Sequence, residues 1–149
     1  MYNGGTSRKT VMARKIYSIF VLVLIVAIAA LNFYAYRFHW YWEFWWFDII
    51  MHTLGGLWVA SCALWLFHFR SLASEPIIAP KKLSVFILAL VAVYVIGGGW
   101  ELFEFSLDKF ITFKIHDAVN TASDLFFDGV GSIVGVFLFL SVYNIQIER

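Results

Sequence analysis

The stretch IYSIFVLVLIVAIAALNFYAY, residues 16–36, contains no acidic, basic or histidine side chain. A helix needs about 20 mostly apolar residues to cross the roughly 30 Å of hydrocarbon in a bilayer, and this stretch is long enough. Three further runs of similar length follow, at about 48–69, 83–105 and 124–145. The sequence therefore predicts an all-α integral membrane bundle of about four transmembrane helices, forming a single membrane domain over residues 1–149.

The composition excludes an ordinary soluble domain. Hydrophobic residues make up 62% of the chain and charged residues 14%, against roughly 45–50% and 25% in typical globular proteins. A soluble domain of 149 residues has too little interior to hide so much apolar surface. The net charge of +1 gives no indication of nucleic-acid binding. We therefore expect the lipid bilayer to be the main partner, with the oligomeric state left open.

The first run also has features of a signal peptide. Basic residues precede it, and Ala27-Ile28-Ala29 fits a small-x-small cleavage site. The apolar run nevertheless continues to an aromatic end at Tyr34 and Tyr36. We therefore interpret it as an uncleaved span.

Basic residues predict the orientation, because Lys and Arg concentrate in cytoplasmic loops. With the N-terminus in the cytoplasm, the cytoplasmic side receives Arg8, Lys9, Arg14, Lys15, Arg70, Lys81, Lys82 and Arg149. The outer side receives only Arg37, Lys109 and Lys114. We therefore predict a multi-pass plasma-membrane protein with both termini cytoplasmic.

Two connections face outward in this topology. Residues 37–47 are dense in Trp, Tyr and Phe, which favour the headgroup layer, so we expect an interfacial aromatic segment. This segment fits either a plain aromatic belt or a lipid-recognition surface. The second connection, residues 106–123, is polar and long enough for a short helix or a re-entrant segment.

Acidic residues gather on the predicted outer side. Of the ten, only Glu75 and Glu148 fall on the cytoplasmic side. Three pairs have helical spacing, which places both members of a pair on one helix face: Asp48 with His52, Glu101 with Glu104, and Asp124 with Asp128. Helix bundles build metal sites from carboxylates and histidines on facing helices. The predicted metal ligands are therefore Asp48, His52, Glu101, Glu104, Asp124 and Asp128.

Other roles are open to these residues individually. Asp48 and Asp124 also fit helix N-caps, and His52 also fits a hydrogen-bonded packing residue. However, His52, Glu101 and Asp128 lie about a turn inside the membrane boundary, where an ionisable group is costly and is a candidate functional residue. Crowded carboxylates repel one another unless a cation or shared protons neutralise them. Oxygen ligands with one imidazole suit Mg²⁺, Mn²⁺ or Ca²⁺, and Zn²⁺ less surely.

Glycines lie near the acidic residues of all three pairs in the sequence. Gly131-x-x-x-Gly135 has the small-xxx-small spacing that allows close helix packing, and Gly97-Gly98-Gly99 precedes Glu101. Close packing and room for a ligand headgroup both fit this pattern. The glycine run could also loosen the third span.

Three motifs in order resemble a known family. Phe47-Asp48-x-x-x-His52 with Gly55 and Gly56, then Glu101-x-x-Glu104, then Asp124-x-x-x-Asp128 with Gly135, are similar to those of the YjdF-type proteins of bacterial inner membranes. These are grouped broadly with the VanZ-like proteins. The resemblance covers about residues 44–140, although YjdF-type proteins have more spans upstream and many VanZ-like members carry Gln or Asn at the positions of Glu104 and Asp128. It implies an inner-membrane location and a link to the cell envelope, without a reaction.

Three functions compete. The first is a metal-dependent membrane enzyme acting on a lipid or cell-envelope substrate, with catalytic candidates Glu101, His116 and Asp117. The second is a cation or proton transporter component, which would need matching polar residues in the cytoplasmic half of the spans. The third is a structural or regulatory membrane protein with a metal-stabilised bundle.

Overall fold

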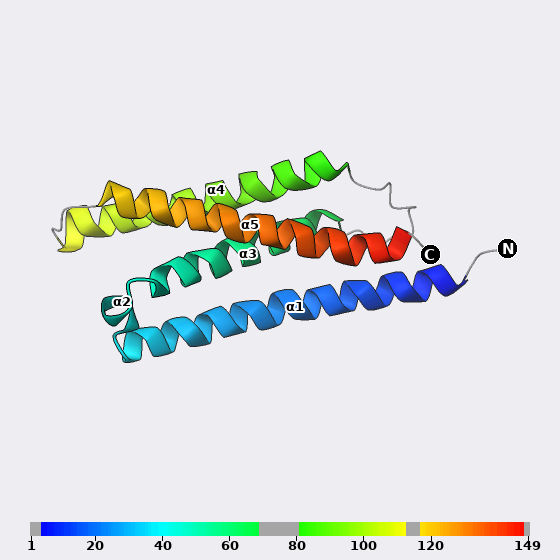
Figure 1. The fold of residues 1–149 in the computed structure, drawn as a ribbon, viewed down its shortest axis with the longest axis horizontal. Coiled ribbons are helices and arrows are strands. Elements are labelled where there is room, and N and C mark those ends of the chain that lie inside the picture. The colour runs from blue at the N-terminus through cyan, green and yellow to red at the C-terminus, as the bar shows by residue number, and fades with distance from the viewer. Residues whose placement is uncertain (1–3, 69–80, 113–116, 148–149) are drawn as a thin grey trace.

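Four long helices run side by side in the computed structural model, which describes residues 4–68, 81–112 and 117–147 (Figure 1). They are α1 (Gly4–Arg37), α3 (Phe47–His68), α4 (Lys82–Leu107) and α5 (Ala118–Ile147). A short helix, α2 (Trp40–Glu43), follows α1, and a π-helical turn, η1 (Asp108–Thr112), continues α4. Each long helix contains a stretch long and apolar enough to cross a membrane. The predicted all-α membrane bundle is confirmed.

The helices around the second outer connection extend further than predicted. Helix α5 begins at Ala118 rather than near Asp124, because Asp117 caps it: its Oδ1 accepts a hydrogen bond of 2.9 Å from the backbone N–H of Val119. At the other side of the connection, α4 runs on into η1. The expected separate helix or re-entrant segment over 106–123 is therefore largely the ends of two long helices, with 113–116 outside the described residues.

The core of the bundle is the contact between α3 and α5, where glycines let the two backbones approach closely. A Cβ atom added to Gly131 would overlap the backbone carbonyl of Thr53, and one added to Gly56 would overlap the carbonyl of Asp128. No side chain fits at either position unless the helices separate. Close packing, one of the two roles considered for the glycines, is thus confirmed at these positions.

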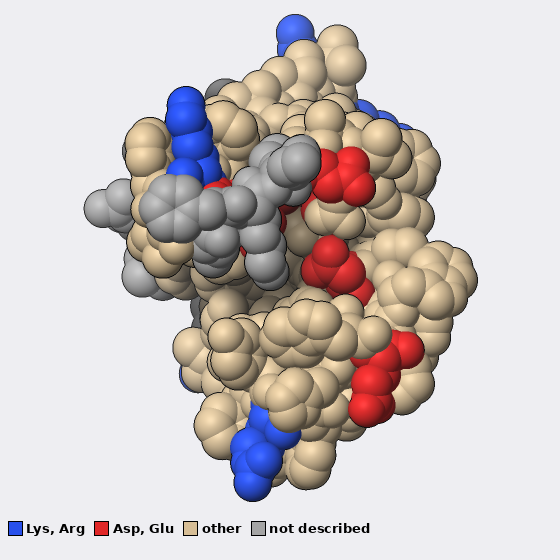
Figure 2. Space-filling view, turned by 90° about the vertical axis from the view of Figure 1, so that its left-hand side faces the viewer, with Lys and Arg blue, Asp and Glu red and all other residues tan. Residues whose placement is uncertain are grey.

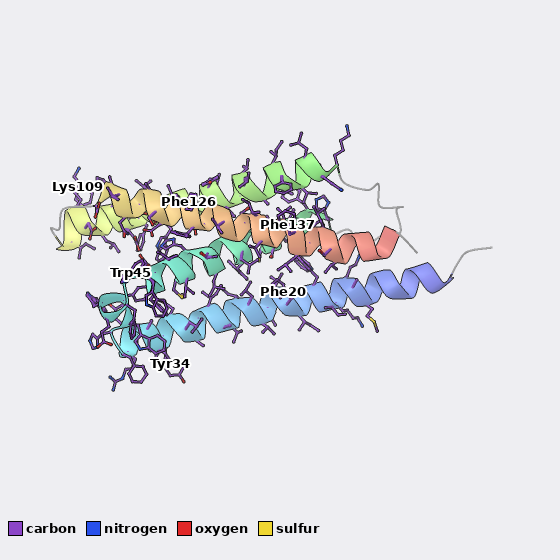
Figure 3. All side chains as sticks on the ribbon, viewed as in Figure 1. Phe20, Tyr34, Trp45, Lys109, Phe126 and Phe137 are labelled. Atoms are coloured by element: carbon purple, nitrogen blue, oxygen red, sulfur yellow. The ribbon has the colours of Figure 1, made fainter. Side chains whose placement is uncertain are left out.

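Helix α1 packs more loosely than the other three (Figure 3). Among its described side chains, only Tyr17 and Ala35 are buried. Its link to α3 includes two indole hydrogen bonds, from Trp58 to the carbonyl of Val21 at 3.2 Å and from Trp65 to the hydroxyl of Ser18 at 2.8 Å. Over the described residues, α1 contacts α3 and α5 but not α4. One side of the bundle between α1 and α4 is therefore not closed by helix–helix packing.

The predicted aromatic segment forms a compact turn at one end of the bundle. His39 adopts a left-handed conformation with φ 59°, which reverses the chain between α1 and α2. The rings of Trp40 and Tyr41 then meet Phe47 edge-on at centroid distances of 5.6 and 5.1 Å. Packing between these rings fixes where α3 begins.

The topology can be tested by reporter fusion. The start of α1 and the end of α5 lie at the same end of the bundle, as an even number of crossings requires (Figure 1). A reporter fused after residue 149 is expected to read cytoplasmic, and one inserted at residue 115 is expected to read external, because of the distribution of basic residues. A C-terminal reporter that reads external would contradict the predicted orientation.

Candidate metal centre

The acidic side chains surround a hollow at the end of the bundle where α3 and α5 begin and α4 ends. Figure 2 views this end and shows red carboxylates beside a central depression. A cavity of about 990 Å³ opens here between α1, α3 and α4. Asp48, His52 and Asp128 line it on one side.

His52 is the centre of the cluster, because three carboxylates approach its ring. Its Nε2 atom lies 3.8 Å from Oδ1 of Asp48 and 3.7 Å from Oδ1 of Asp124. Its Nδ1 atom lies 3.4 Å from Oδ1 of Asp128. The imidazole is therefore flanked by two aspartates at one nitrogen and by a third at the other. One ligand atom from each of Asp48, His52 and Asp124 lies within 4.8 Å of the other two.

Asp124 does not cap α5 but projects from about two turns inside it, in a buried position. Its side chain is 3% exposed. Its second oxygen, Oδ2, accepts a hydrogen bond of 2.6 Å from the side-chain amide of Asn120 one turn earlier. Asn120 therefore orients the carboxylate and leaves Oδ1 facing His52. The sequence analysis missed Asn120, although extending the Asp124–Asp128 face by one turn reaches it.

Asp128 lies deeper, between glycines of two other helices. Its side chain is 8% exposed. A Cβ atom on Gly97 of α4 would overlap the Asp128 carboxylate, and one on Gly55 of α3 would lie 3.9 Å from it. Gly97 thus provides room for a buried carboxylate, and α4 stays helical through Gly98 and Gly99.

Glu101 and Glu104 occupy two different environments. Glu101 is 5% exposed, and neither of its carboxylate oxygens has a hydrogen-bond partner among the described residues. It lies close enough to Asp124 and Glu104 for their charges to interact. Glu104 lines the cavity and accepts a hydrogen bond of 2.9 Å from the indole N–H of Trp100. The structure therefore brings all six predicted ligands to one region, with Glu101 and Glu104 outside the group centred on His52.

Tyr41 is a second residue that the sequence analysis missed. Its hydroxyl donates a hydrogen bond of 2.8 Å to Asn32 of α1, and its ring lines the cavity. Burial, followed by the charges of Asp48 and Glu104, raises the pKa of Tyr41 to about 12. The phenol is therefore protonated at physiological pH and serves as a neutral hydrogen-bond donor. A lone Tyr in an aromatic run gave no signal for this role.

Of the remaining catalytic candidates, Asp117 lines a second, smaller pocket together with Asp48, Asn120 and Asp124. Asp117 is exposed and caps α5, where its Oδ1 also accepts from the N–H of Asn120 at 3.4 Å. This contact gives Asp117 a structural role of its own. His116 lies outside the described residues.

The nitrogen–oxygen distances at Nε2 of His52 are longer than those of direct hydrogen bonds. Hydrogen bonds from nitrogen to oxygen measure 2.7–3.2 Å, shorter than the 3.7 and 3.8 Å found here. Two ligand atoms that share one ion at about 2.0–2.4 Å lie about 2.8–3.9 Å apart at angles of about 90–110°. The donor set and its spacing are therefore compatible with a divalent cation.

Comparison with known proteins gives one family. A family model described as "Predicted membrane protein (DUF2238)" matches residues 5–144. No curated protein and no solved structure matches the chain. The family match covers all four long helices and every described residue of the cluster, so the cluster lies within the part that defines the family.

Proposed function

The chain belongs to this family of predicted membrane proteins, and on that premise we propose that it is a metal-dependent membrane enzyme acting on a lipid or cell-envelope substrate. The observation that carries the proposal is the grouping of Asp48, His52 and Asp124 within 4.8 Å, with Asp48 and His52 lining a large cavity. Buried Glu101, with two unpartnered oxygens beside Asp124, is a second sign of a missing positive charge.

The proposed ligand atoms are Nε2 of His52 and the Oδ1 atoms of Asp48 and Asp124, which lie 3.8 and 3.7 Å from it. A ligating Nε2 requires the proton of a neutral imidazole to sit on Nδ1, which lies 3.4 Å from Asp128. Asp128 would then accept that proton in a hydrogen bond and fix the ring, as carboxylates behind metal-bound histidines do. Glu101, whose charge interacts with that of Asp124, is a candidate for a fourth ligand.

The proposed reaction would take place in the cavity, beside the ion. A divalent ion at this wall would polarise an oxygen of a substrate or lower the pKa of a bound water. Glu104 lines the same cavity and lies within electrostatic range of His52 and Asp48. We therefore assign proton transfer to Glu104, with the neutral Tyr41 phenol as a hydrogen-bond donor. The finer resemblance to YjdF-type and VanZ-like proteins agrees with an envelope substrate.

Metal dependence of stability tests the proposal. A cation that binds only the folded form adds RT ln(1 + [L]/Kd), or ~2.7 kcal/mol at a hundredfold excess over Kd. For a chain of this size that corresponds to about 5–10 °C in melting temperature. We expect EDTA to lower the melting temperature of the purified protein in detergent by this amount, and one of Mn²⁺, Mg²⁺, Ca²⁺ or Zn²⁺ to restore it. The effect should fade below about pH 5, where carboxylates become protonated and lose the ion.

The matched controls for this test are acidic residues at the same end of the bundle. Asp48→Ala/His52→Ala should abolish the response, whereas Glu43→Gln should leave it intact, because Glu43 is exposed and outside the cavity. A wild-type melting curve that is unchanged by EDTA and by all four ions at pH 7 would contradict the proposal. A metal response without turnover of any membrane lipid would contradict the proposed enzyme and would favour a structural protein whose bundle is stabilised by metal.

A second candidate function, transfer of protons or cations, is favoured by one observation. Buried hydroxyls continue from the cluster into the other half of the bundle: Ser132 one turn after Asp128, then Ser61, which interacts with Tyr17. A transporter would need polar residues of this kind in the cytoplasmic half of the spans. These hydroxyls carry no charge, so a conducting path would need water molecules between them.

A further inference from the structure

The cavity has the depth of one bilayer leaflet. Along α3 its lining runs from Asp48 to Val59, which is about 16 Å at 1.5 Å per helical residue. This is about half of the roughly 30 Å of hydrocarbon. Its volume of about 990 Å³ is at the upper limit of ordinary ligand pockets, which measure about 300–1,000 Å³. A long ligand that lies along the helices would fill it.

The two ends of the cavity differ in chemistry. The deep end is lined by aliphatic side chains of three helices, including Ile25, Val59 and Val93. The mouth is lined by Asp48, His52, Glu104 and Asp108, with Tyr41, Trp42 and Trp100 between them. The ligand is therefore expected to have a hydrocarbon part and a polar head that interacts with carboxylates.

The open side of the cavity faces outward from the helix bundle, where lipid would surround a membrane protein. Its walls include α1 and α4, which do not contact each other over the described residues. Ile28 and Ala29 of α1 line the cavity, whereas Ala30, the next residue, does not. A lipid could therefore enter sideways between α1 and α4 without leaving the bilayer.

The charges at the mouth restrict the headgroup. No Lys or Arg is among the described residues that line the cavity, so a head with only negative charge would be repelled by the carboxylates there. A metal ion held by Asp48, His52 and Asp124 would accept a phosphate oxygen. Glu104 and Asp108 remain beside it, and the indole faces of Trp42 and Trp100 are suited to a cation. With that ion bound, the mouth would offer one positive and one negative position.

From these four features we infer that the cavity binds a single phospholipid with an ammonium headgroup. The phosphate lies at the metal, the ammonium lies against Glu104 and the tryptophans, and an acyl chain follows α1 toward Ile25. Contact of the phosphate with the ion rests on the proposed function. The ammonium and chain contacts do not depend on it.

Native mass spectrometry of the full chain tests this inference. The detergent-purified protein with Mn²⁺ is offered an equimolar mixture of phosphatidylethanolamine and phosphatidylglycerol with identical chains. We expect one retained lipid, with about tenfold preference for phosphatidylethanolamine. Glu104→Gln should reduce the preference to less than about threefold, because the ammonium loses its charged partner. Glu43→Gln, which removes an acid outside the cavity, should keep the full preference.

A matched pair of bulky substitutions tests the chain position. Ala29→Trp should reduce retention of both lipids by about tenfold, whereas Ala30→Trp should not, because only Ala29 lines the cavity. Both alanines are exposed in α1, and an unchanged metal-dependent melting temperature shows that each variant is folded. Equal retention of the two lipids by the wild-type protein, or equal retention by the two tryptophan variants, would overturn the inference. If the melting temperature depends on metal but the protein shows no lipid preference, only the lipid-binding inference is refuted. If the protein prefers phosphatidylethanolamine but its melting temperature does not depend on metal, only the proposed metal site is refuted.

Discussion

Gly131→Leu is expected to destabilise the bundle by about 3 kcal/mol or more, the largest stability effect of any single substitution considered. A side chain at this position would overlap the backbone of Thr53 and Leu57 in α3. Overpacking of a side chain against flexible neighbours costs about 1–3 kcal/mol. Here the obstacle is the backbone of the neighbouring helix, so α3 and α5 must separate. The melting temperature in detergent and the yield of monodisperse protein measure the effect.

Gly99→Leu is the matched control, because a Cβ atom at Gly99 meets nothing within 4 Å. Leucine also has a higher helix propensity than glycine, by up to about 1 kcal/mol. This variant should therefore melt at or above the temperature of the wild-type protein. If Gly131→Leu and Gly99→Leu melted alike, the close contact between α3 and α5 would be wrong.

Asp128→Ala is expected to weaken metal binding by about 10–100-fold, the effect usual for loss of a carboxylate behind a metal-bound histidine. The reason is geometric: Asp128 faces Nδ1 of His52, whereas the proposed ligands face Nε2. Asp128→Asn should have an intermediate effect, since an amide oxygen can still accept the Nδ1 proton without the charge. Calorimetric titration with Mn²⁺, together with the electron paramagnetic resonance spectrum of the bound ion, measures affinity and coordination.

The metal-free protein should respond in the opposite direction. Removing one of several crowded carboxylates lowers their repulsion, so Asp128→Ala should melt at or above the wild-type temperature in EDTA. A purely structural role for Asp128 would instead lower stability with and without metal. Metal affinity equal to that of the wild-type protein would refute the positioning role.

The four long helices could be predicted from the sequence because a helix that crosses a bilayer needs about 20 mostly apolar residues. The start of α5 was predicted at about Asp124, whereas the helix begins at Ala118. The prediction followed the hydropathy of the run, which does not take the helix cap at Asp117 into account. The cap depends on one backbone hydrogen bond, and hydropathy does not report it. The three pairs of acids did come together, because residues at i, i+3 and i+4 must share a helix face.

The arrangement within the cluster could not be predicted in the same way. Helical spacing places Asp124 and Asp128 on one face, but it does not reveal that they approach opposite nitrogens of His52. That difference depends on the tilt of α5 across α3, which is set by the contacts at Gly56 and Gly131. The cavity likewise depends on the distance between α1 and α4. Both features arise from tertiary packing.

The clustered side chains belong to two helices that are synthesised at different times, and this affects when the proposed cation can bind. Asp48 and His52 belong to α3, whereas Asp124 and Asp128 belong to α5, which the ribosome makes later. At about 5–20 residues per second, the interval between His52 and Asp124 lasts several seconds to about a quarter of a minute. During that time the α3 pair is in the membrane without its partners. The proposed cation could therefore be held by Asp48, His52 and Asp124 together only after α5 has been inserted, so binding of the ion would follow insertion and would not guide the placement of α3.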